Sequence, residues 1–315
     1  MTTVRVRVPA SSANLGPGFD SLALALALYN TVEVTALPGG GEPVVRVEVS
    51  GEGAEELPTD STNAVVRAME AVYARAGQSV PRLHVRLENA IPLQSGLGSS
   101  ASACAAGVAA ANALLGEAMD RHALFRLTAD LEGHPDNASG AVFGGLTASS
   151  RGASGFVARR LPLAPDLRVA VALPAVRLST PQQRAALPSQ VPFADAAANI
   201  GRALLVAQAL ADADYALLAE VMCDRLHEPY RTPHIPGVEA AIAAAREAGA
   251  AAVALSGSGP ALITFAPANH SAIAEAMREA FRRAGVEARV WTLPVDQEGV
   301  VVTARQERSI NARKP

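Results

Sequence analysis

The segment PLQSGLGSSAS, residues 92–102, holds two glycines and three serines within six consecutive residues. An alanine-rich, apolar stretch follows and predicts a buried helix over residues 99–115. A buried helix leaves its first backbone amides without intrahelical acceptors, and such amides attract phosphate. Small residues keep these amides accessible and the serines add hydroxyl groups. The segment therefore predicts a phosphate-binding loop in preference to a plain turn into a core helix.

The chain contains a single lysine, Lys314, next to its C-terminus. A Walker A loop needs an internal lysine on the phosphates, and a pyridoxal enzyme needs one for its Schiff base. Both classes are excluded. Arginine, whose planar fork suits carboxylate and phosphate, must supply the cations of any site.

Two charged residues are expected at helix ends where the dipole disfavours them. The run Thr180–Gln183 has the pattern of an N-cap, a proline at the first helical position and the start of a capping box. Arg184 would then lie in a first turn, and Glu132 would end a helix over residues 120–131. Each has an ordinary surface residue as its simpler interpretation, but a ligand of opposite charge would compensate it.

The same glycines also match the dinucleotide fingerprint G-x-G-x-x-A through Gly96, Gly98 and Ala101. That fingerprint requires a strand directly before the first glycine and an acidic residue at the end of a second strand. Here Pro92 interrupts the strand, and Glu117 falls between two helices. An NAD-binding oxidoreductase is therefore the weaker alternative.

The elements that must position these residues predict a two-domain α+β chain. Alternating apolar residues predict strands over residues 4–8, 22–36, 44–50 and 83–89, with a loop over 9–20. The polar run Ser149–Gly155 is typical of a linker and predicts domains over residues 1–152 and 153–315. In the second domain the order β, α, β, β, α, β is that of a ferredoxin-like unit with additional helices.

Composition narrows the class of protein. The chain has 315 residues, half of them hydrophobic, and a net charge of -3, which argues against nucleic-acid binding. No apolar run reaches ~18 residues, so no membrane span is expected. Cys104 and Cys223 lie too far apart for a CxxC motif and suit a reducing compartment, so we expect a cytoplasmic protein. A homodimer is the default oligomer.

The pattern P-x-x-x-G-L-G-S-S-A over residues 92–101 resembles the phosphate loop of the GHMP kinase superfamily. This resemblance implies an N-terminal, ribosomal-protein-S5-domain-2-like domain that binds ATP and a C-terminal ferredoxin-like domain that contributes to the substrate site. It also implies ATP and Mg²⁺ as cofactors. The implied nucleotide-binding residues are Pro92, Leu93, Gln94, Ser95, Gly96, Leu97, Gly98, Ser99, Ser100, Ala101 and Ser102, with Asn63 as a further candidate.

Five further segments are similar to the homoserine kinase branch of this superfamily. They are residues 9–26, 132–137, 179–188, 227–237 and 255–261. The resemblance implies transfer of phosphate from ATP to the side-chain hydroxyl of L-homoserine, giving O-phospho-L-homoserine on the route to threonine. A mevalonate-type kinase of the same superfamily and a non-catalytic ligand sensor remain alternatives.

An amino-acid substrate is a zwitterion, so it needs a cation for its carboxylate and an acceptor for its ammonium. The substrate-binding candidates are Asn14, Asp20, Asn137, Thr180, Arg184 and Arg231. Arg184 and Arg231 are the candidate cations, and Asp20 is the candidate acceptor. Prolines flank Arg231 and indicate a rigid loop.

The resemblance implies Ser100 and Glu132 as ligands of Mg²⁺, a number that suits a cation that also binds phosphates and water. It assigns the catalytic positions to Asn14, Asn137 and Arg184. Although His134 and Asp136 precede Asn137, we expect no catalytic base, because positioning and charge neutralisation dominate phosphoryl transfer.

Overall fold

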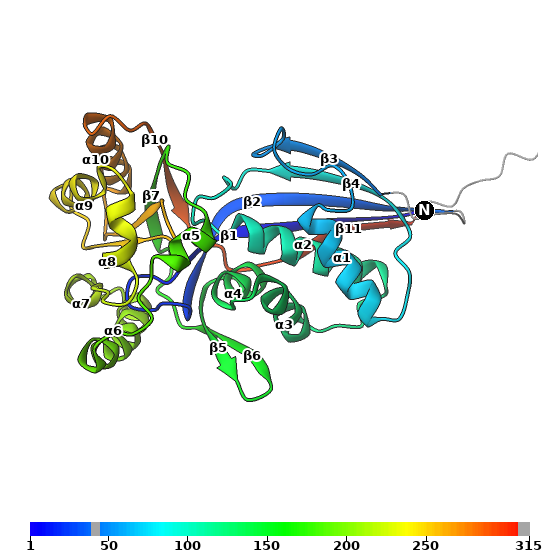
Figure 1. The fold of residues 1–315 in the computed structure, drawn as a ribbon, viewed down its shortest axis with the longest axis horizontal. Helices are drawn as coiled ribbons and strands as arrows, with labels where there is room; N and C mark the ends of the chain where they lie inside the picture. Colours follow the sequence, from blue (N-terminus) through cyan, green and yellow to red (C-terminus); the bar gives the residue numbers. More distant parts are fainter. Residues whose placement is uncertain (39–44, 308–315) are drawn as a thin grey trace, which may run out of the picture.

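The computed structural model describes residues 1–38 and 45–307 of the chain. Its elements form two sheets, each covered by helices (Figure 1). The first sheet has seven strands in the order β11-β1-β2-β4-β3, with β5 pairing with β2 and β6 pairing with β5. Its strands are β1 (Thr2–Ala13), β2 (Leu22–Leu37), β3 (Val45–Gly51), β4 (Arg82–Asn89), β5 (Leu146–Gly152), β6 (Gly155–Leu161) and β11 (Val301–Glu307).

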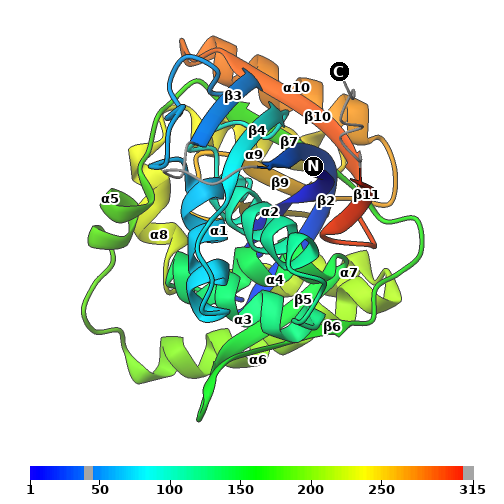
Figure 2. The ribbon, with the colours of Figure 1, turned by 90° about the vertical axis from the view of Figure 1, so that its right-hand side faces the viewer.

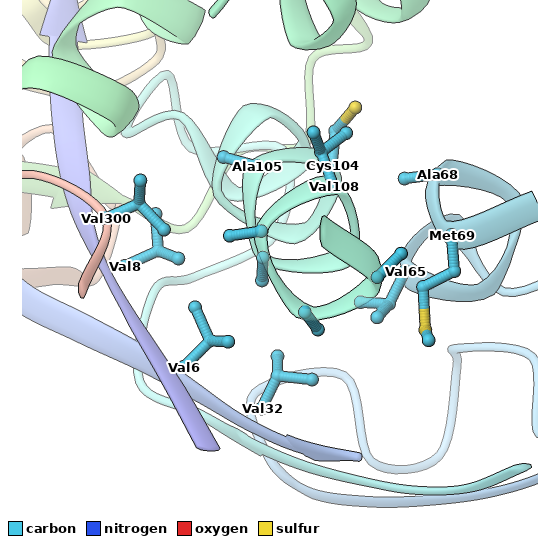
Figure 3. Close-up of a cluster of buried hydrophobic side chains, with 14 of the residues drawn as sticks. Val6, Val8, Val32, Val65, Ala68, Met69, Cys104, Ala105, Val108 and Val300 are labelled. Carbon is cyan, nitrogen blue, oxygen red and sulfur yellow. The ribbon is translucent and has the colours of Figure 1, made fainter. Parts of the chain in front are cut away.

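Four helices pack on one face of the first sheet (Figure 1). They are α1 (Ala64–Arg75), α2 (Ser99–Leu114), α3 (Arg121–Glu132) and α4 (Asp136–Phe143). Figure 3 shows α2 between the valines of the sheet and the apolar face of α1. A Cβ added at Gly107 would lie 2.3 Å from the carbonyl oxygen of Val65, so this glycine permits the close approach of α1 and α2. The predicted buried helix is thus confirmed, and it presents its N-terminus toward the second sheet (Figure 1).

The second sheet has four strands in the order β10-β7-β9-β8, and all of its pairs are antiparallel. Its strands are β7 (Arg168–Pro174), β8 (Ala252–Leu255), β9 (Leu262–Phe265) and β10 (Ala288–Pro294). Its helices are α5 (Thr180–Ala185), α6 (Phe193–Asp212), α7 (Tyr215–Val221), α8 (Glu228–Arg231), the 3₁₀ turn Thr232–His234, α9 (Val238–Glu247) and α10 (His270–Arg283). The predicted ferredoxin-like order is confirmed, and α5 to α8 are the additional helices.

Two expectations about connections are wrong. The run Ser149–Gly155 is not a linker, because β5 and β6 pair across it as a hairpin. Residues 9–13 are not loop, because β1 continues beside β2 to Ala13 after an irregularity between Pro9 and Ala10. In both places backbone pairing with a neighbouring strand outweighs the polar, small-residue composition.

The sheets do not divide the chain at one position. Both β6 and β11 pair in the first sheet, although they follow residue 152. We retain the division into residues 1–152 and 153–315 as a proposal, with these two strands crossing it. In the described part of the chain, none of the helices combines the length and apolar character that a membrane span requires.

Candidate active site

The glycine-serine loop leads into the N-terminus of α2 as the sequence predicts. Gly98 is the N-cap of α2 at φ 72°, and no side chain caps the helix. Two hydrogen bonds inside the loop hold its conformation. Ser95 Oγ donates to the carbonyl of Pro92 at 2.7 Å and accepts from the amide of Leu97 at 3.2 Å. The first amides of α2 therefore remain available to an anion.

The loop SGSGP, residues 256–260, supports the phosphate loop from the second sheet. Ser256 Oγ donates to the carbonyl of Gly96 at 2.8 Å, and the amide of Ala261 donates to the carbonyl of Ser95 at 3.1 Å. A Cβ at Gly96 would lie 2.1 Å from the carbonyl oxygen of Ser256. Glycine at position 96 is required by this close approach, so segments some 160 residues apart form one unit.

A cavity of about 170 Å³ opens at the mouth of α2. It collects residues from both halves of the chain. The sequence-predicted residues that line it are Asn14, Asp20, Gln94, Ser95, Gly96, Gly98, Ser99, Ser100, Ala101, Glu132, Asn137, Arg184 and Arg231.

Ser100 and Glu132 meet at one side of this mouth. Ser100 Oγ donates to Glu132 Oε1 at 2.8 Å, which joins the first turn of α2 to the last residue of α3. Burial raises the pKa of Glu132, and the bond from Ser100 opposes that shift. A hydroxyl and a carboxylate oxygen side by side are the hard donors that Mg²⁺ prefers, so this pair fits that ion.

Asn137, which lines the same cavity, is held in one orientation. Its Oδ1 accepts from Ser11 Oγ at 2.8 Å, so its NH₂ group is the part left to donate to a ligand. The neighbouring Asp136 is already engaged, because its Oδ1 accepts from the amide of Asn137 and contacts His134 Nδ1, both at 2.8 Å. The hydrogen bond to Asp136 raises the pKa of His134.

Asn14 lines the cavity, but both ends of its side-chain amide are bound to the protein. Its Nδ2 donates to the carbonyl of Gly257 at 2.7 Å, and its Oδ1 accepts from the amide of Asp20 at 2.9 Å. Its backbone has φ 72°, a conformation that asparagine tolerates. These contacts show Asn14 fixing the loop that carries Asp20. Contact of Asn14 with a substrate hydroxyl stays a prediction.

Asp20 and Arg184 bind each other across the two halves of the chain. Arg184 Nη1 and Nη2 donate to the two carboxylate oxygens of Asp20, each at 2.9 Å, and this bond raises the pKa of Arg184. The expected position of Arg184 in a first helical turn is wrong. Ser179 is the N-cap of α5, so Arg184 lies in its last turn, where a cation is favourable.

Arg231 is a buried cation without a carboxylate in ion-pair contact among the described residues. Its side chain is 2% exposed and reaches only uncharged acceptors. Nη1 lies 3.3 Å from both His227 Nδ1 and the carbonyl of Gly257, and Nε lies 3.4 Å from the carbonyl of Gln183. Burial lowers the pKa of Arg231. An anionic ligand in the cavity would compensate this charge.

His227 and Phe19 complete the surroundings of Arg231. His227 Nε2 lies 2.9 Å from the carbonyl of Gly16, so Nε2 is the protonated nitrogen and Nδ1 accepts from Arg231. Burial lowers the pKa of His227, which keeps the imidazole neutral. The ring of Phe19 stacks on His227 with centroids 5.1 Å apart and lies under both Arg184 and Arg231. No sequence pattern singles out these two residues, although they lie within residues 9–26 and 227–237, which carry the family resemblance.

A second cavity, of about 270 Å³, adjoins the first through Gln94, Ser99 and Ser100. Its walls are mainly apolar and include Leu93 and Asn63, and such a pocket suits a planar base. The Asn63 side chain is occupied, because it caps α1 at the amide of Val65 and donates to the carbonyl of Pro58.

Four of the predicted residues do not line either cavity as expected. Leu97 and Ser102 are fully buried in the protein, and Pro92 lines a separate cavity beside β7 and β10. The side chain of Thr180 lies outside the described part of the structure.

Comparison with known proteins decides the family. The chain is 42% identical to a homoserine kinase of Moorella thermoacetica over 297 residues, which cover 94% of this chain and 99% of that protein. It is 39% identical over 298 residues to a homoserine kinase of Carboxydothermus hydrogenoformans, covering 95% and 96%. The chain belongs to the homoserine kinase family.

Family models and solved structures agree with this membership. Residues 63–145 match the GHMP kinases N terminal domain, and residues 206–283 match the GHMP kinases C terminal domain. A homoserine kinase structure from Cytophaga hutchinsonii superposes with a TM-score of 0.86 at 29% identity, covering 95% of this chain and 97% of that one. A mevalonate kinase of L. major has a TM-score of 0.69 at 17% identity over 92% and 95%, which shows a shared fold alone.

Membership of the homoserine kinase family confirms the α+β GHMP kinase fold and excludes the oxidoreductase alternative. The geometry gives the physical reason. The element after α2 is the helix α3 and not a strand, so the glycines at positions 96 and 98 do not open a βαβ unit.

Proposed function

We propose that this chain transfers the γ-phosphoryl group of ATP to the side-chain hydroxyl of L-homoserine, giving ADP and O-phospho-L-homoserine for threonine biosynthesis. The observation that carries the proposal is the buried Arg231 guanidinium, which shares a cavity with the uncapped N-terminus of α2. The guanidinium suits the carboxylate of an amino acid, and the helix N-terminus suits the phosphates of a nucleotide.

We infer that the nucleotide spans the two adjoining cavities. The apolar cavity beside α1 accommodates the base, and the amides of residues 98–101 bind the phosphates. Ser100 and Glu132 are the residues that would hold Mg²⁺, and the bound ion supplies charge neutralisation on the transferring phosphoryl group. We propose that the enzyme acts in the cytoplasm, which suits its free cysteines.

We propose that the substrate enters the cavity with its carboxylate toward Arg231 and Arg184 and its ammonium toward Asp20. The Asp20–Arg184 pair already holds the two opposite charges that a zwitterion would divide between its ends. The NH₂ group of Asn137 donates to the oxygen of the acceptor hydroxyl and orients it toward the phosphoryl group. No carboxylate is assigned as base, because Asp136 is engaged with His134 and Asn137.

A coupled ADP-release assay tests the reaction. We expect turnover with L-homoserine and background rates with L-serine, whose chain is one carbon shorter, and with mevalonate, which has no ammonium group. Equal turnover of mevalonate would reject the proposed acceptor.

Arg231→Gln tests the carboxylate site. Because this change removes a desolvated charge opposite a carboxylate, we expect the KM for homoserine to rise about 100-fold, with the KM for ATP unchanged. Arg225→Gln, at an exposed position nearby, is the matched control and should change neither value. A parallel rise in both KM values would indicate general damage to the site instead of loss of a carboxylate contact.

A further inference from the structure

Three separate segments supply acceptors to the guanidinium of Arg231. Its Nε lies 3.4 Å from the carbonyl of Gln183 on α5, and its Nη1 lies 3.3 Å from both the carbonyl of Gly257 and His227 Nδ1. The helices α5 and α8 lie beside each other, and Arg231 is the last residue of α8 (Figure 2). Among the described residues these contacts engage Nε and Nη1, which leaves Nη2 to a ligand in the cavity that Arg231 lines.

His227 is the side chain among these acceptors, since the other two are backbone carbonyls. The position of a carbonyl follows from the backbone, whereas an imidazole needs contacts of its own to orient it. The backbone amide of His227 donates to Asp224 Oδ2 at 2.7 Å, and its Nε2 donates to the carbonyl of Gly16 at 2.9 Å. The ring of Phe19 stacks on the imidazole. The ring is therefore fixed in direction, with Nδ1 toward Arg231.

Asp224 is buried and connects this histidine to α6. Its Oδ1 accepts from Asn199 Nδ2 at 2.7 Å, and its Oδ2 also accepts from the amide of Glu228 at 2.7 Å. Asn199 is buried on α6 and its Nδ2 also donates to the carbonyl of Pro17 at 3.3 Å. One buried hydrogen-bond network thus joins α6, the loop after β1 and the start of α8, and it ends at Arg231. A buried network whose members are all satisfied is rigid.

The imidazole can orient the guanidinium without neutralising it. Burial lowers the pKa of His227. Asp224, whose Oδ2 lies 3.7 Å from Nε2, opposes this shift, and the Arg231 cation adds to it. A neutral ring accepts a hydrogen bond at Nδ1 but carries no negative charge. A carboxylate in the same place would form an ion pair with Arg231 and compete with an anionic ligand, whereas the neutral acceptor leaves the positive charge to the ligand.

We propose that His227 is a positioning residue, which fixes the direction of the Arg231 guanidinium so that Nη2 meets the carboxylate of the substrate. This inference rests on the proposed function, in which Arg231 binds that carboxylate. The planar fork of a guanidinium matches a carboxylate in a defined geometry. Ordering a long side chain at the moment of binding costs affinity, and the contact with His227 removes this cost before the substrate arrives.

Two substitutions test the two nitrogens of His227 separately. Glutamine carries its amide nitrogen near the position of Nε2, so His227→Gln retains a donor to Gly16 and loses the acceptor for Arg231. Asparagine carries its amide oxygen near the position of Nδ1, so His227→Asn retains the acceptor and loses the donor. In steady-state kinetics we expect the KM for homoserine to rise at least about 10-fold in His227→Gln and to stay within ~3-fold of wild type in His227→Asn. The KM for ATP should be unchanged in both.

Stability should follow the opposite order. Urea titrations should show His227→Asn to be the less stable of the two proteins, because it loses the contact with the carbonyl of Gly16. The variant with the better KM is then the one with the weaker fold. His234→Gln, the same substitution at an exposed position three residues after Arg231, is the matched control and should change neither KM nor stability.

A double-mutant cycle tests whether His227 acts through Arg231. In the Arg231→Gln background, His227→Gln should cause no further rise in the KM for homoserine, because the guanidinium that it positions is absent. A wild-type KM in His227→Gln, a KM that follows stability in the two variants, or losses that add in the cycle would overturn the proposal and leave His227 a packing role alone. Failure of the proposed function is a different result, namely a wild-type KM for homoserine in Arg231→Gln itself.

Discussion

Phe19 lies at the point where the charged residues of the site converge. Its ring centroid is 5.6 Å from the Arg184 guanidinium and 5.2 Å from that of Arg231, and His227 stacks on it. Two cations close to each other repel, and Arg184 indeed contributes to the lowered pKa of Arg231. An aromatic face attracts both cations and so reduces the cost of holding them together.

Phe19→Leu should therefore weaken substrate binding without affecting the nucleotide. Two cation–π contacts of about 0.5–1 kcal/mol each correspond to a rise of roughly 5- to 30-fold in the KM for homoserine. Steady-state kinetics at saturating ATP measure this change. Phe19→Tyr retains the π face and should stay close to wild type. An unchanged KM in Phe19→Leu would contradict this role for the ring.

At this scale the sequence predicts which residues meet but not how they are paired. Asp20 and Arg184 were both predicted at the substrate, yet they are 164 residues apart and bind each other. A sequence pattern describes neighbours along the chain, whereas this pair arises because the fold brings the loop after β1 and the helix α5 together. The same reason accounts for the missed contact between His227 and the carbonyl of Gly16.

At the scale of elements, the start of α2 depends on one glycine. Gly98 has φ 72°, and a Cβ there would lie 2.3 Å from Ser11 Oγ and 3.0 Å from Asn137 Oδ1. The second contact would disturb the residue that we propose orients the acceptor.

Gly98→Ala should lower kcat by about 100-fold, because displacement of the reacting groups by an ångström is enough for such a loss. Gly116→Ala is the matched control, since that glycine also has positive φ, 91°, but nothing lies within 4 Å of its Cβ position. Both variants should lose about 1–2 kcal/mol of unfolding free energy in urea titrations from the left-handed backbone, and Gly98→Ala should lose more because of its close contacts, but only Gly98→Ala should lose activity. Equal activity in the two would show that the close approach is tolerated.

The short helix α8 is connected to β8 by a carboxyl group whose pKa is strongly shifted. Glu228 Oε1 accepts from the amide of Leu255 at 2.7 Å, and burial raises the pKa of Glu228 to about 7. The folded protein therefore keeps this proton between the ordinary glutamate pKa and pH 7, while the unfolded chain has lost it. The contribution of Glu228 to stability is complete below the ordinary pKa and decreases as the pH rises to about 7.

Glu228→Gln should remove this dependence, because glutamine retains the acceptor and carries no proton to lose. Relative to the variant, the wild type should lose up to about 3 kcal/mol of unfolding free energy between pH 4.5 and pH 7. Denaturant titrations of both proteins across this range measure the difference. A difference that stays constant with pH would contradict the raised pKa.

The sequence predicts the elements whose apolar residues recur with a clear period, and it does not predict the elements that lack such a period. The helices α2 and α3 and the strand β4 lie within one residue of their predicted bounds. The composition of the segment that forms the β5–β6 hairpin predicts a linker, but its Ser, Gly and Arg residues reflect an exposed position and not the absence of strand pairing. The cap of α5 was misplaced by one residue, since Ser179 and Thr180 are equally good N-caps in sequence.

At the scale of the whole molecule, the chain returns to the sheet from which it began. The strand β11 pairs with β1 along Thr2–Arg7, and Arg121 donates to the carbonyls of Glu298 and Val300 just before it. This return places β1 between two neighbours, β2 and β11. Composition alone does not predict it, because the polar run before Val300 resembles the end of a domain.

A chain ending at Val300 should be much less stable. Loss of β11 would leave β1 as an unpaired edge with its hydrogen-bonding groups exposed. We expect a loss of more than about 3 kcal/mol of unfolding free energy and a reduced yield of soluble protein. Val302→Thr, at a residue 37% exposed, is a control within β11 and should change stability little. A truncated chain with wild-type stability would show that β11 is dispensable.

The proposed binding of phosphate by main-chain amides affects how the whole molecule can be chemically labelled. Because we propose that main-chain amides and arginines perform the tasks that other kinases give to lysine, the one lysine of this sequence, Lys314, is not among the proposed site residues. Reagents that acylate or reductively alkylate lysine therefore have no target among the proposed site residues. Dye-labelling or immobilisation through Lys314 should leave turnover unchanged.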